Sequence, residues 1–198
     1  MRARAEAAEA TRARVIEAAR AAILDGPAPR VSMGDVARRA GVARSTLYAT
    51  YGSHAGLIGA VLADAGLRGG FERMLELINL PDAADGIRRF LPEAARMFGA
   101  DYELTRRIQL LAQLDPEVMK TLGVAARAKA DGMLYQAGRL AEQGRLRPSV
   151  TVEQAARLLY LLTDFGTYDA MRTTWALETD EIGQLMVAVA SRHLFREG

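Results

Sequence analysis

The chain has 198 residues, half of them hydrophobic and a quarter charged, enough to bury the core of one or two ordinary globular domains. The absence of cysteine excludes disulfides and thiolate ligands, and two histidines are too few for a histidine-rich zinc site. No segment approaches the ~20 apolar residues of a membrane span, and the basic N-terminus lacks the apolar core of a secretory signal. We therefore expect a cytoplasmic protein that uses no metal and no cofactor.

The charge is unevenly distributed along the chain, although the formal net charge is only +2. Up to Gly70, ten arginines stand against six acidic residues, whereas the remainder has sixteen basic and eighteen acidic residues. A basic excess confined to one segment is the pattern expected where only that segment meets a polyanion.

The composition predicts an all-α protein, because Ala, Leu, Arg and Glu dominate and alternating β-branched runs are absent. In the N-terminal part we predict helices at about 10–24, 32–40, 44–51 and 54–67. Ser32 and Asp35 have the spacing of a capping box, and Ser53 precedes the fourth helix. The glycine-rich segment 66–70 is interpreted as a flexible junction. Further helices are predicted at 83–99, 102–114, 117–144, 152–172 and 179–195, with a kink or break at Pro92 in the first of these.

The second and third predicted helices have the pattern of a helix-turn-helix. Their inward positions carry apolar residues, namely Val36, Ala37, Ala40, Val42, Leu47 and Tyr51. A small residue at the helix crossing and Gly41 at the turn suit two helices that meet steeply. An ordinary polar helix in a bundle is the alternative, and the spacing disfavours it.

If Leu47 and Tyr51 face inward, the other face of the third helix presents a surface without carboxylates. Its residues are Arg44, Ser45, Thr46, Tyr48 and Thr50. Hydroxyl groups, a guanidinium and an aromatic edge can contact phosphates and base edges, and the major groove of DNA admits one helix. The sequence therefore predicts a nucleic-acid-reading surface.

At this point the sequence resembles the TetR family of bacterial transcriptional regulators. The resemblance rests on the segment from "TRARVIEAAR" to "HAGLIGAVL", and most specifically on "DVARRAGVARSTLYATY". It implies an N-terminal helix-turn-helix DNA-binding domain at 1–55 and a larger helical ligand-binding and dimerisation domain at 56–198. The implied DNA contacts are Ser32, Arg44, Ser45, Thr46, Tyr48, Ala49, Thr50 and His54.

Four residues in this segment depart from the family pattern: Ala43, Thr50 (where the family often has His or Tyr), His54 and Ala55 (where a Glu is usual). Ala43 replaces a common capping serine, which removes an N-cap worth ~1 kcal/mol from the third helix. His54 replaces a lysine that usually binds phosphate at the start of the fourth helix.

The C-terminal part carries apolar and aromatic residues that, in a TetR-like fold, would surround a cavity. The predicted pocket residues are Phe71, Met74, Met97, Phe98, Leu104, Ile108, Leu111, Met133, Gln136, Asp164 and Tyr168. Each of them can equally be an ordinary core residue, and that alternative stays open.

The segments 152–172 and 179–195 are apolar over much of their surface, which favours burial on two sides. Two such helices from each of two chains would form a four-helix bundle, and a homodimer suits a palindromic DNA site. The predicted interface residues are Leu158, Leu162, Phe165, Leu185 and Val189. A monomeric core is the alternative.

These features predict a one-component regulator, a repressor released from a palindromic operator by a small apolar or amphipathic ligand. A DNA-binding regulator without such an effector, controlled by a partner or by abundance, is the alternative. An enzyme is not expected, because the chain has no HExxH, nucleophile-elbow or P-loop motif.

Overall fold

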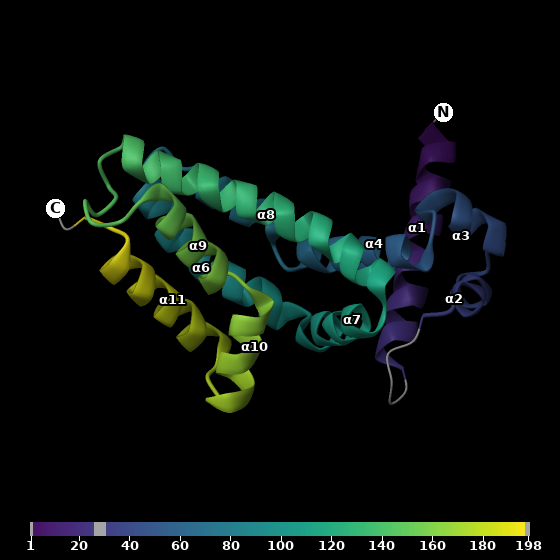
Figure 1. Ribbon diagram of the computed structural model, residues 1–198. Coiled ribbons are helices and arrows are strands. Elements are labelled where there is room, and N and C mark those ends of the chain that lie inside the picture. The colour runs from purple at the N-terminus through teal and green to yellow at the C-terminus, as the bar shows by residue number, and fades with distance from the viewer. Residues whose placement is uncertain (1, 26–30, 197–198) are drawn as a thin grey trace. The chain divides into compact units, whose positions relative to one another are not determined.

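The computed structural model describes residues 2–25 and 31–196 and confirms the predicted all-α class (Figure 1). Within these residues, extended pairing is limited to one antiparallel bridge between Leu146 and Phe195. The helices are α1 (Arg2–Leu24), α2 (Met33–Ala40), α3 (Arg44–Tyr51), α4 (His54–Arg68), α5 (Phe71–Ile78), α6 (Ala83–Ala100), α7 (Tyr102–Leu114), α8 (Pro116–Glu142), α9 (Val152–Leu162), α10 (Phe165–Thr174) and α11 (Thr179–His193).

The chain forms two compact units. The division between them does not coincide with the domain boundary predicted after residue 55. Unit 1 comprises residues 1–65 and 102–124, and unit 2 comprises residues 66–101 and 125–198. Unit 1 therefore adds most of α4, all of α7 and the start of α8 to the helix-turn-helix. These added helices supply the core of unit 1 with apolar surface beyond that of the predicted three-helix domain.

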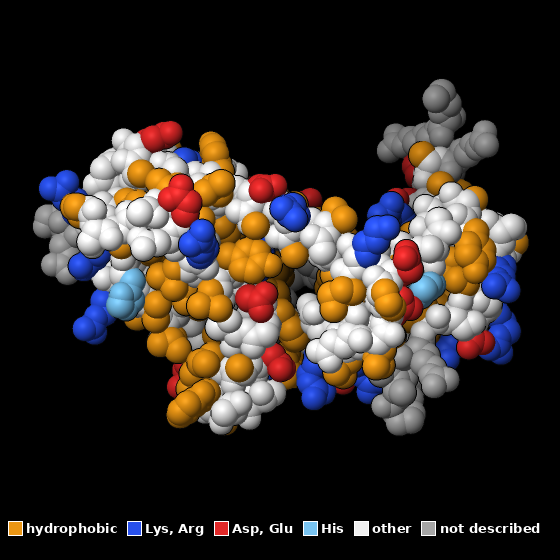
Figure 2. Space-filling model, in the orientation of Figure 1, with side chains coloured by type: hydrophobic (Ala, Val, Ile, Leu, Met, Phe, Trp, Pro, Cys, Tyr) orange, Lys and Arg blue, Asp and Glu red, His pale blue; other side chains and the backbone are white. Residues whose placement is uncertain are grey.

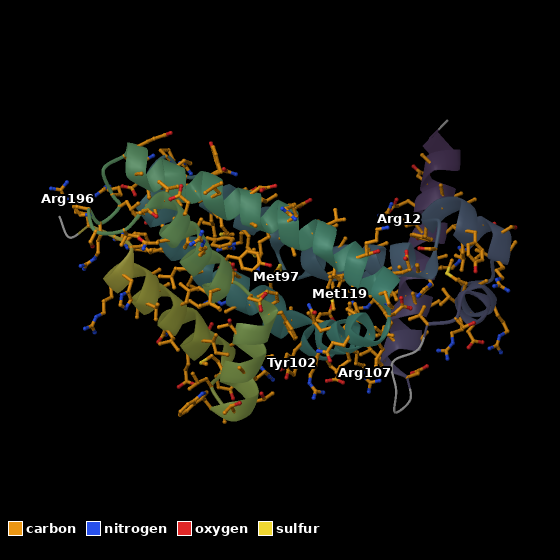
Figure 3. The ribbon with its side chains drawn as sticks, viewed as in Figure 1. Arg12, Met97, Tyr102, Arg107, Met119 and Arg196 are labelled. Carbon is orange, nitrogen blue, oxygen red and sulfur yellow. The ribbon has the colours of Figure 1, made fainter. Side chains whose placement is uncertain are left out.

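The core of unit 1 is built from one apolar stripe on each helix. Val15, Ala19 and Ile23 line the buried side of α1, which packs against α2 and α7. Arg107 of α7 donates a hydrogen bond to the carbonyl of Ile23 at 3.2 Å and so satisfies an orphan acceptor at the end of α1 (Figure 3). The three helices that carry the predicted DNA contacts therefore rest on a continuous apolar base.

The core of unit 2 centres on α6, which packs against α5 and α11. Helix α6 continues through Pro92, so the predicted break at this residue is wrong. A Cβ on Gly183 would lie 3.0 Å from the Pro92 Cα, which shows how closely α11 approaches α6 at this point. Gly183 thus permits a contact that any larger residue would obstruct.

Three predicted elements differ from the structure. The first helix begins at Arg2 rather than near residue 10, and the supposed junction is followed by α5, whose Met74 and Ile78 are buried. The predicted helix 152–172 is two helices. The Thr163 hydroxyl donates to the Leu159 carbonyl at 2.8 Å, and the Asp164 side chain accepts from the Gly166 amide at 2.8 Å. These two local hydrogen bonds end α9 and begin α10.

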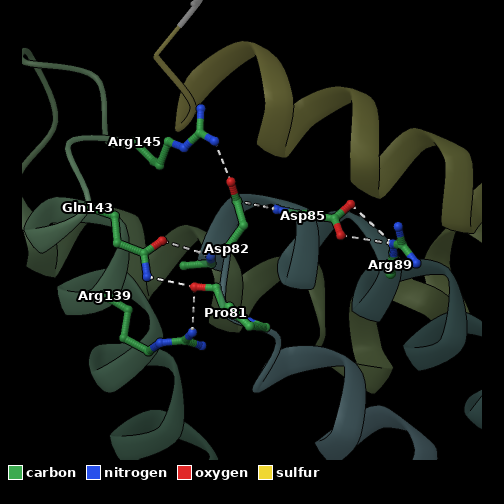
Figure 4. Close-up of polar contacts among 8 residues, drawn as sticks. Pro81, Asp82, Asp85, Arg89, Arg139, Gln143 and Arg145 are labelled. Carbon is green, nitrogen blue, oxygen red and sulfur yellow. Dashed lines mark hydrogen bonds and ion pairs between the residues drawn. The ribbon is translucent and has the colours of Figure 1, made fainter.

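The turn between α5 and α6 is fixed by side chains from the end of α8 (Figure 4). Gln143 donates to the Pro81 carbonyl at 2.9 Å and accepts from the Ala83 amide at 2.9 Å. Arg145 pairs with Asp82, the N-cap of α6. The Arg139 guanidinium donates to three backbone carbonyls of this turn, those of Ile78, Leu80 and Pro81. Side chains at the end of α8 and just after it therefore supply donors to the carbonyls of this turn.

Candidate nucleic-acid interface

The predicted helix-turn-helix is present, with α2 and α3 joined by a three-residue turn. Val36, Ala37 and Leu47 are buried, and Val42 and Tyr51 pack against the same core. Leu47 is only 1% exposed, although it belongs to a helix whose other residues are partly or fully exposed. One buried side chain thus fixes which face of α3 points outward.

Gly41 makes the turn possible because its backbone is left-handed, with φ of 66°. Its amide bonds back to the carbonyls of Ala37 and Arg38, and the Val42 amide reaches the Ala37 carbonyl at 3.0 Å. These bonds close the end of α2 and turn the chain directly into α3.

The outward face of α3 carries the predicted contact residues, all of them exposed: Arg44, Ser45, Thr46, Tyr48, Ala49 and Thr50. Helix α3 contains no acidic residue. A phosphate backbone approaching this face meets one guanidinium and several hydroxyl groups without carboxylate repulsion.

Arg44 and Tyr48 form one prearranged pair on this face. The Arg44 Nη2 donates to the Tyr48 hydroxyl at 3.2 Å, and the guanidinium carbon lies 5.4 Å from the ring centroid. The pair holds a positive charge and a phenol one helical turn apart on the same side of α3. Thr50 is different, because its hydroxyl donates to the Thr46 carbonyl at 2.9 Å, so its methyl group is the part free to meet a base.

Ser32 caps α2, as predicted, with its hydroxyl oxygen 3.5 Å from the Asp35 amide. The side chain is exposed and keeps its own O–H as a donor for an anion at this helix N-terminus. Asp35 pairs with Arg38 within α2, and Arg39 of α2 pairs at 2.6 Å with Asp25, which follows α1, so both acids are compensated by arginines of α2.

His54 pairs with an acidic residue, and its role as a phosphate contact stays a prediction. Its Nε2 lies 2.7 Å from Oδ2 of Asp115, in a partly buried pair. The other Asp115 oxygen accepts from the backbone amides of Glu117 and Val118 and so caps α8. The hydrogen bond from His54 is the largest of the effects that hold the Asp115 pKa below its usual value, followed by those amides.

The predicted pocket residues fall into both units. Leu104, Ile108 and Leu111 belong to the core of unit 1, alongside α1 and α4. Phe71 is 41% exposed on α5. The remaining predicted residues lie in unit 2: Met74, Met97, Phe98, Met133, Gln136, Asp164 and Tyr168. Of these, Gln136 is buried with its side-chain oxygen accepting from Arg139 at 2.9 Å.

Aromatic rings converge within unit 2 between α6 and α10. The ring centroids of Phe98 and Phe165 are 5.5 Å apart, and those of Phe98 and Tyr168 are 5.6 Å apart. The Tyr168 hydroxyl, fully buried, bonds to the Thr179 hydroxyl at 2.8 Å. These rings pack on each other as a core does, and only Phe98 of the three is partly exposed.

The predicted interface residues divide between core and surface. Leu162 and Phe165 are buried inside unit 2, so they are not available to a partner chain. Leu158, Leu185 and Val189 reach the surface, where they line two open grooves along α9 and α11. Leu161, which the sequence analysis did not single out, is 57% exposed. Figure 2 shows hydrophobic side chains gathered over α9, α10 and α11.

Neither a metal centre nor a membrane segment is apparent in the part of the chain that the structure describes. Among residues 2–25 and 31–196, no three histidine or acidic side chains gather as metal ligands would. The helices over the same residues are too short or too polar to cross a membrane.

Comparison with known proteins supports the resemblance noted from the sequence. Residues 15–61 match the family model of bacterial regulatory proteins of the tetR family. A search of curated proteins gives no match. The family resemblance is therefore confirmed over α1 to α4, the segment that contains the helix-turn-helix.

Solved structures share the fold over nearly the whole chain. NalD, the secondary repressor of the MexAB-OprM multidrug efflux pump in Pseudomonas aeruginosa, is 23% identical with a TM-score of 0.74, and the alignment covers 98% of this chain and 100% of NalD. SmeT, the repressor of the Stenotrophomonas maltophilia pump SmeDEF, is 18% identical with a TM-score of 0.71, covering 94% and 91% of the two chains. A SmeT–triclosan complex has a TM-score of 0.72 at 17% identity, covering 96% and 93%.

Proposed function

We propose that this protein is a one-component transcriptional regulator that binds a palindromic DNA operator as a homodimer. The observation that carries the proposal is the exposed, acid-free face of α3, held outward by the buried Leu47 and the left-handed Gly41. Such a face fits a major groove, where Arg44 and Tyr48 would contact phosphates while Ala49 and the Thr50 methyl would meet base edges. For a regulator that acts on DNA we expect a cytoplasmic location and no enzymatic activity.

A homodimer is proposed because one copy of α3 reads one half-site, and two half-sites lie about 34–36 Å apart along one face of DNA. The grooved surface of α9 and α11 is the candidate interface. It exposes Leu161 and Leu185 beside the partly exposed Leu158 and Val189, an arrangement that a second copy would cover.

Repression relieved by a small ligand is the mode of regulation that we propose. NalD and SmeT are repressors, and SmeT forms a complex with triclosan. A ligand of this kind changes operator occupancy only by its difference in affinity between the DNA-competent state and the released state.

A regulator without a small-molecule effector is the second candidate, and the packing of the predicted pocket residues favours it. Three of these residues are core of unit 1, and Gln136 and Tyr168 are buried with hydrogen-bond partners. For a protein controlled by abundance alone, no small molecule should raise the thermal unfolding temperature or release the operator.

Nuclease footprinting on DNA flanking the protein's own gene tests DNA binding. We expect a protected palindrome. Arg44→Ala should weaken it about tenfold or more and lower the slope of log affinity against log salt by about one. Tyr48→Phe should weaken it several-fold, and Arg127→Ala, an exposed arginine of α8 in unit 2, should leave it unchanged. Equal protection by all three variants would contradict the assigned face.

Sedimentation velocity tests the interface. Leu185→Asp places a charge on the α9–α11 surface and should convert a dimer to a monomer. Leu75→Asp is the matched control, because Leu75 of α5 is 46% exposed and Leu185 is 42% exposed. If both variants remain dimeric, the interface lies elsewhere.

A further inference from the structure

A histidine and an aspartate pair at the start of α4, directly after the helix that presents the DNA-reading face. The Nε2 atom of His54 lies 2.7 Å from Oδ2 of Asp115, and the two side chains are 36% and 32% exposed. Among the described residues, Asp115 is the only side chain that contacts His54 through a hydrogen bond or an ion pair. Both residues belong to unit 1, as α3 does. The pair is therefore part of the unit that carries the DNA-binding surface.

The contacts of Asp115 determine where the protons of His54 lie. The Oδ1 atom of Asp115 accepts from the backbone amides of Glu117 and Val118 at 2.9 and 3.3 Å. The hydrogen bond from His54, followed by those amides, holds the Asp115 pKa below its usual value, so this carboxylate is ionised at neutral pH. An ionised carboxylate only accepts hydrogen bonds, and Nε2 must therefore be the donor. Nδ1 is then the ring nitrogen that gains or loses a proton.

The net charge of the pair depends on this proton. With a neutral ring the pair carries the one negative charge of Asp115, and with a protonated ring it has no net charge. DNA is a polyanion, so it binds more tightly to the form that lacks the negative charge. Protonation also turns Nδ1 from an acceptor into a donor, which the predicted phosphate contact of His54 requires. Both effects favour DNA binding by the protonated form.

His54 is the only histidine of unit 1, since His193 belongs to unit 2. The remaining charged side chains of unit 1 are carboxylates, arginines and a lysine, residue types that keep their charge between about pH 5.5 and 8. On the helices that share a core with α4 they include Glu9 and Arg12 of α1, Asp35, Arg38 and Arg39 of α2, Arg44 of α3, Asp64 of α4, Glu103, Arg106 and Arg107 of α7, and Glu117 and Lys120 of α8. A change of DNA affinity over this pH range therefore points to His54 within this unit.

The pair lies close enough to the DNA-reading face for its charge to affect binding. Thr50, the last residue of that face, precedes His54 by four residues, so their Cα atoms are at most about 14 Å apart. The turn between them is compact, because the Ser53 amide bonds back to the Tyr51 carbonyl at 2.8 Å. The Debye length is about 8–10 Å at physiological ionic strength and longer in dilute buffer. A unit charge at His54 is therefore only partly screened from the phosphates that α3 meets.

From this geometry we infer that DNA binding by this protein takes up a proton on His54, so that its affinity for the operator rises as the pH falls below neutral. The inference rests on the proposed function, because it adds a form of regulation to the same DNA-binding surface. The interaction of one unit charge with phosphates about 10 Å away in water changes the affinity about threefold, or about tenfold for two subunits. One proton per subunit is the upper limit, so the slope of log affinity against pH for a dimer is no steeper than about −2.

Fluorescence anisotropy of the full chain with labelled duplex DNA, measured between about pH 5.5 and 8, tests the inference. One duplex carries DNA flanking the protein's own gene, and the other is its shuffled counterpart, because the charge effect needs no base contact. We expect affinity for the flanking duplex to be about tenfold higher at pH 5.5 than at pH 8 in dilute buffer, with a change of the same sign for the shuffled duplex. The ratio should shrink as salt is raised to about 0.3 M. Thermal unfolding at each pH verifies that the protein is folded.

Substitutions at the pair separate charge from structure. His54→Gln leaves a constant negative charge and should lose the increase on acidification, whereas His54→Lys has no net charge at either pH and should bind at pH 8 about as tightly as the wild type binds at pH 5.5. Asp115→Asn retains an oxygen to cap α8 and removes the negative charge, so it should bind DNA several-fold more tightly at pH 8. A purely structural role of the pair would instead weaken binding in Asp115→Asn. His193→Gln, at the other histidine of the chain, is the matched control and should keep the whole increase.

Three results would overturn the inference: a flat pH profile of the wild type, an unchanged profile in His54→Gln, or loss of the profile in His193→Gln alone. The shuffled duplex keeps this inference separate from the proposed function. Equal affinity for the two duplexes counts against an operator beside the gene, while the pH profile of the shuffled duplex still decides the role of His54. Preference for the flanking duplex with a flat profile leaves a DNA-binding regulator and removes His54 as its proton site.

Discussion

The N-terminus of the recognition helix α3 lacks a side-chain cap, and restoring one should stabilise the protein. Ala43 occupies the N-cap position with extended backbone angles, φ −69° and ψ 142°, and makes no side-chain cap bond. Its methyl group is exposed, so a hydroxyl added there displaces nothing from a core. A serine oxygen at this position can accept from the Ser45 or Thr46 amide in the first turn of α3, in addition to the bond that the Thr46 amide makes to the carbonyl of residue 43 at 3.0 Å.

The size of the effect follows from measured N-caps. An alanine replaced by serine at an extended N-cap gains about 1 kcal/mol, within a range of about 0.5–2 kcal/mol. For a chain of this length that free energy raises the unfolding temperature by about 2–4 °C. Differential scanning calorimetry at fixed protein concentration is the suitable measurement, because a dimer's unfolding temperature also depends on concentration.

Ala49→Ser is the control for this prediction. Ala49 is exposed on the same helix but lies in its interior, where serine is a poorer helix former than alanine by about 0.5 kcal/mol. Ala43→Ser should therefore raise the unfolding temperature while Ala49→Ser lowers it slightly. Equal changes of the unfolding temperature in both variants would refute the assignment of Ala43 as an uncapped N-cap. Such a result would mean that an added hydroxyl has the same effect at either position.

Two further predictions concern polar contacts of α8. The Asp115 pKa is lowered, chiefly by the hydrogen bond from His54 and then by amides of α8. Ionised Asp115 therefore stabilises the fold above about pH 4, and this stabilisation is lost as the pH falls through the lowered pKa. The difference in unfolding free energy between wild type and Asp115→Asn, from urea titrations, should shrink between about pH 5 and pH 3; a constant difference contradicts this. Arg139→Met leaves the Ile78 and Leu80 carbonyls without their donor and should cost about 2–4 kcal/mol by urea unfolding, against almost nothing for the exposed Arg127→Met. Equal costs would refute the role of Arg139.

Much of the helix-turn-helix could be predicted from the sequence because its determinants are local. Gly41 at the turn, Ala37 at the crossing and Leu47 on the inner face lie within eleven residues of one another, and the structure buries the two apolar ones. Helix periodicity then decides which side of α3 is exposed, without knowledge of any distant contact.

The features that sequence reasoning missed depend on residues far apart in the chain. His54 and Asp115 are 61 residues apart, and Lys129 meets the Thr163 carbonyl across 34 residues. Asp115 does carry a local signal, since an acid before Pro116 predicts a helix cap, but nothing in that signal names His54 as its partner. The end of α9 was missed because Thr163 and Asp164 sit in an apolar stretch whose periodicity continues across them.

Periodicity also cannot separate a pocket residue from a core residue, since both are apolar and face inward. Leu104 and Ile108 satisfy the helical stripe of α7 whether they contact a ligand or α1, and the structure places them in the unit 1 core. What distinguishes a binding site is an imbalance, a polar group held inside the fold with fewer partners than its chemistry allows. By that criterion neither buried Gln136 nor half-buried Lys129 marks a binding site, because Arg139 donates to Gln136 and Lys129 meets the Thr163 carbonyl and the Asp164 carboxylate.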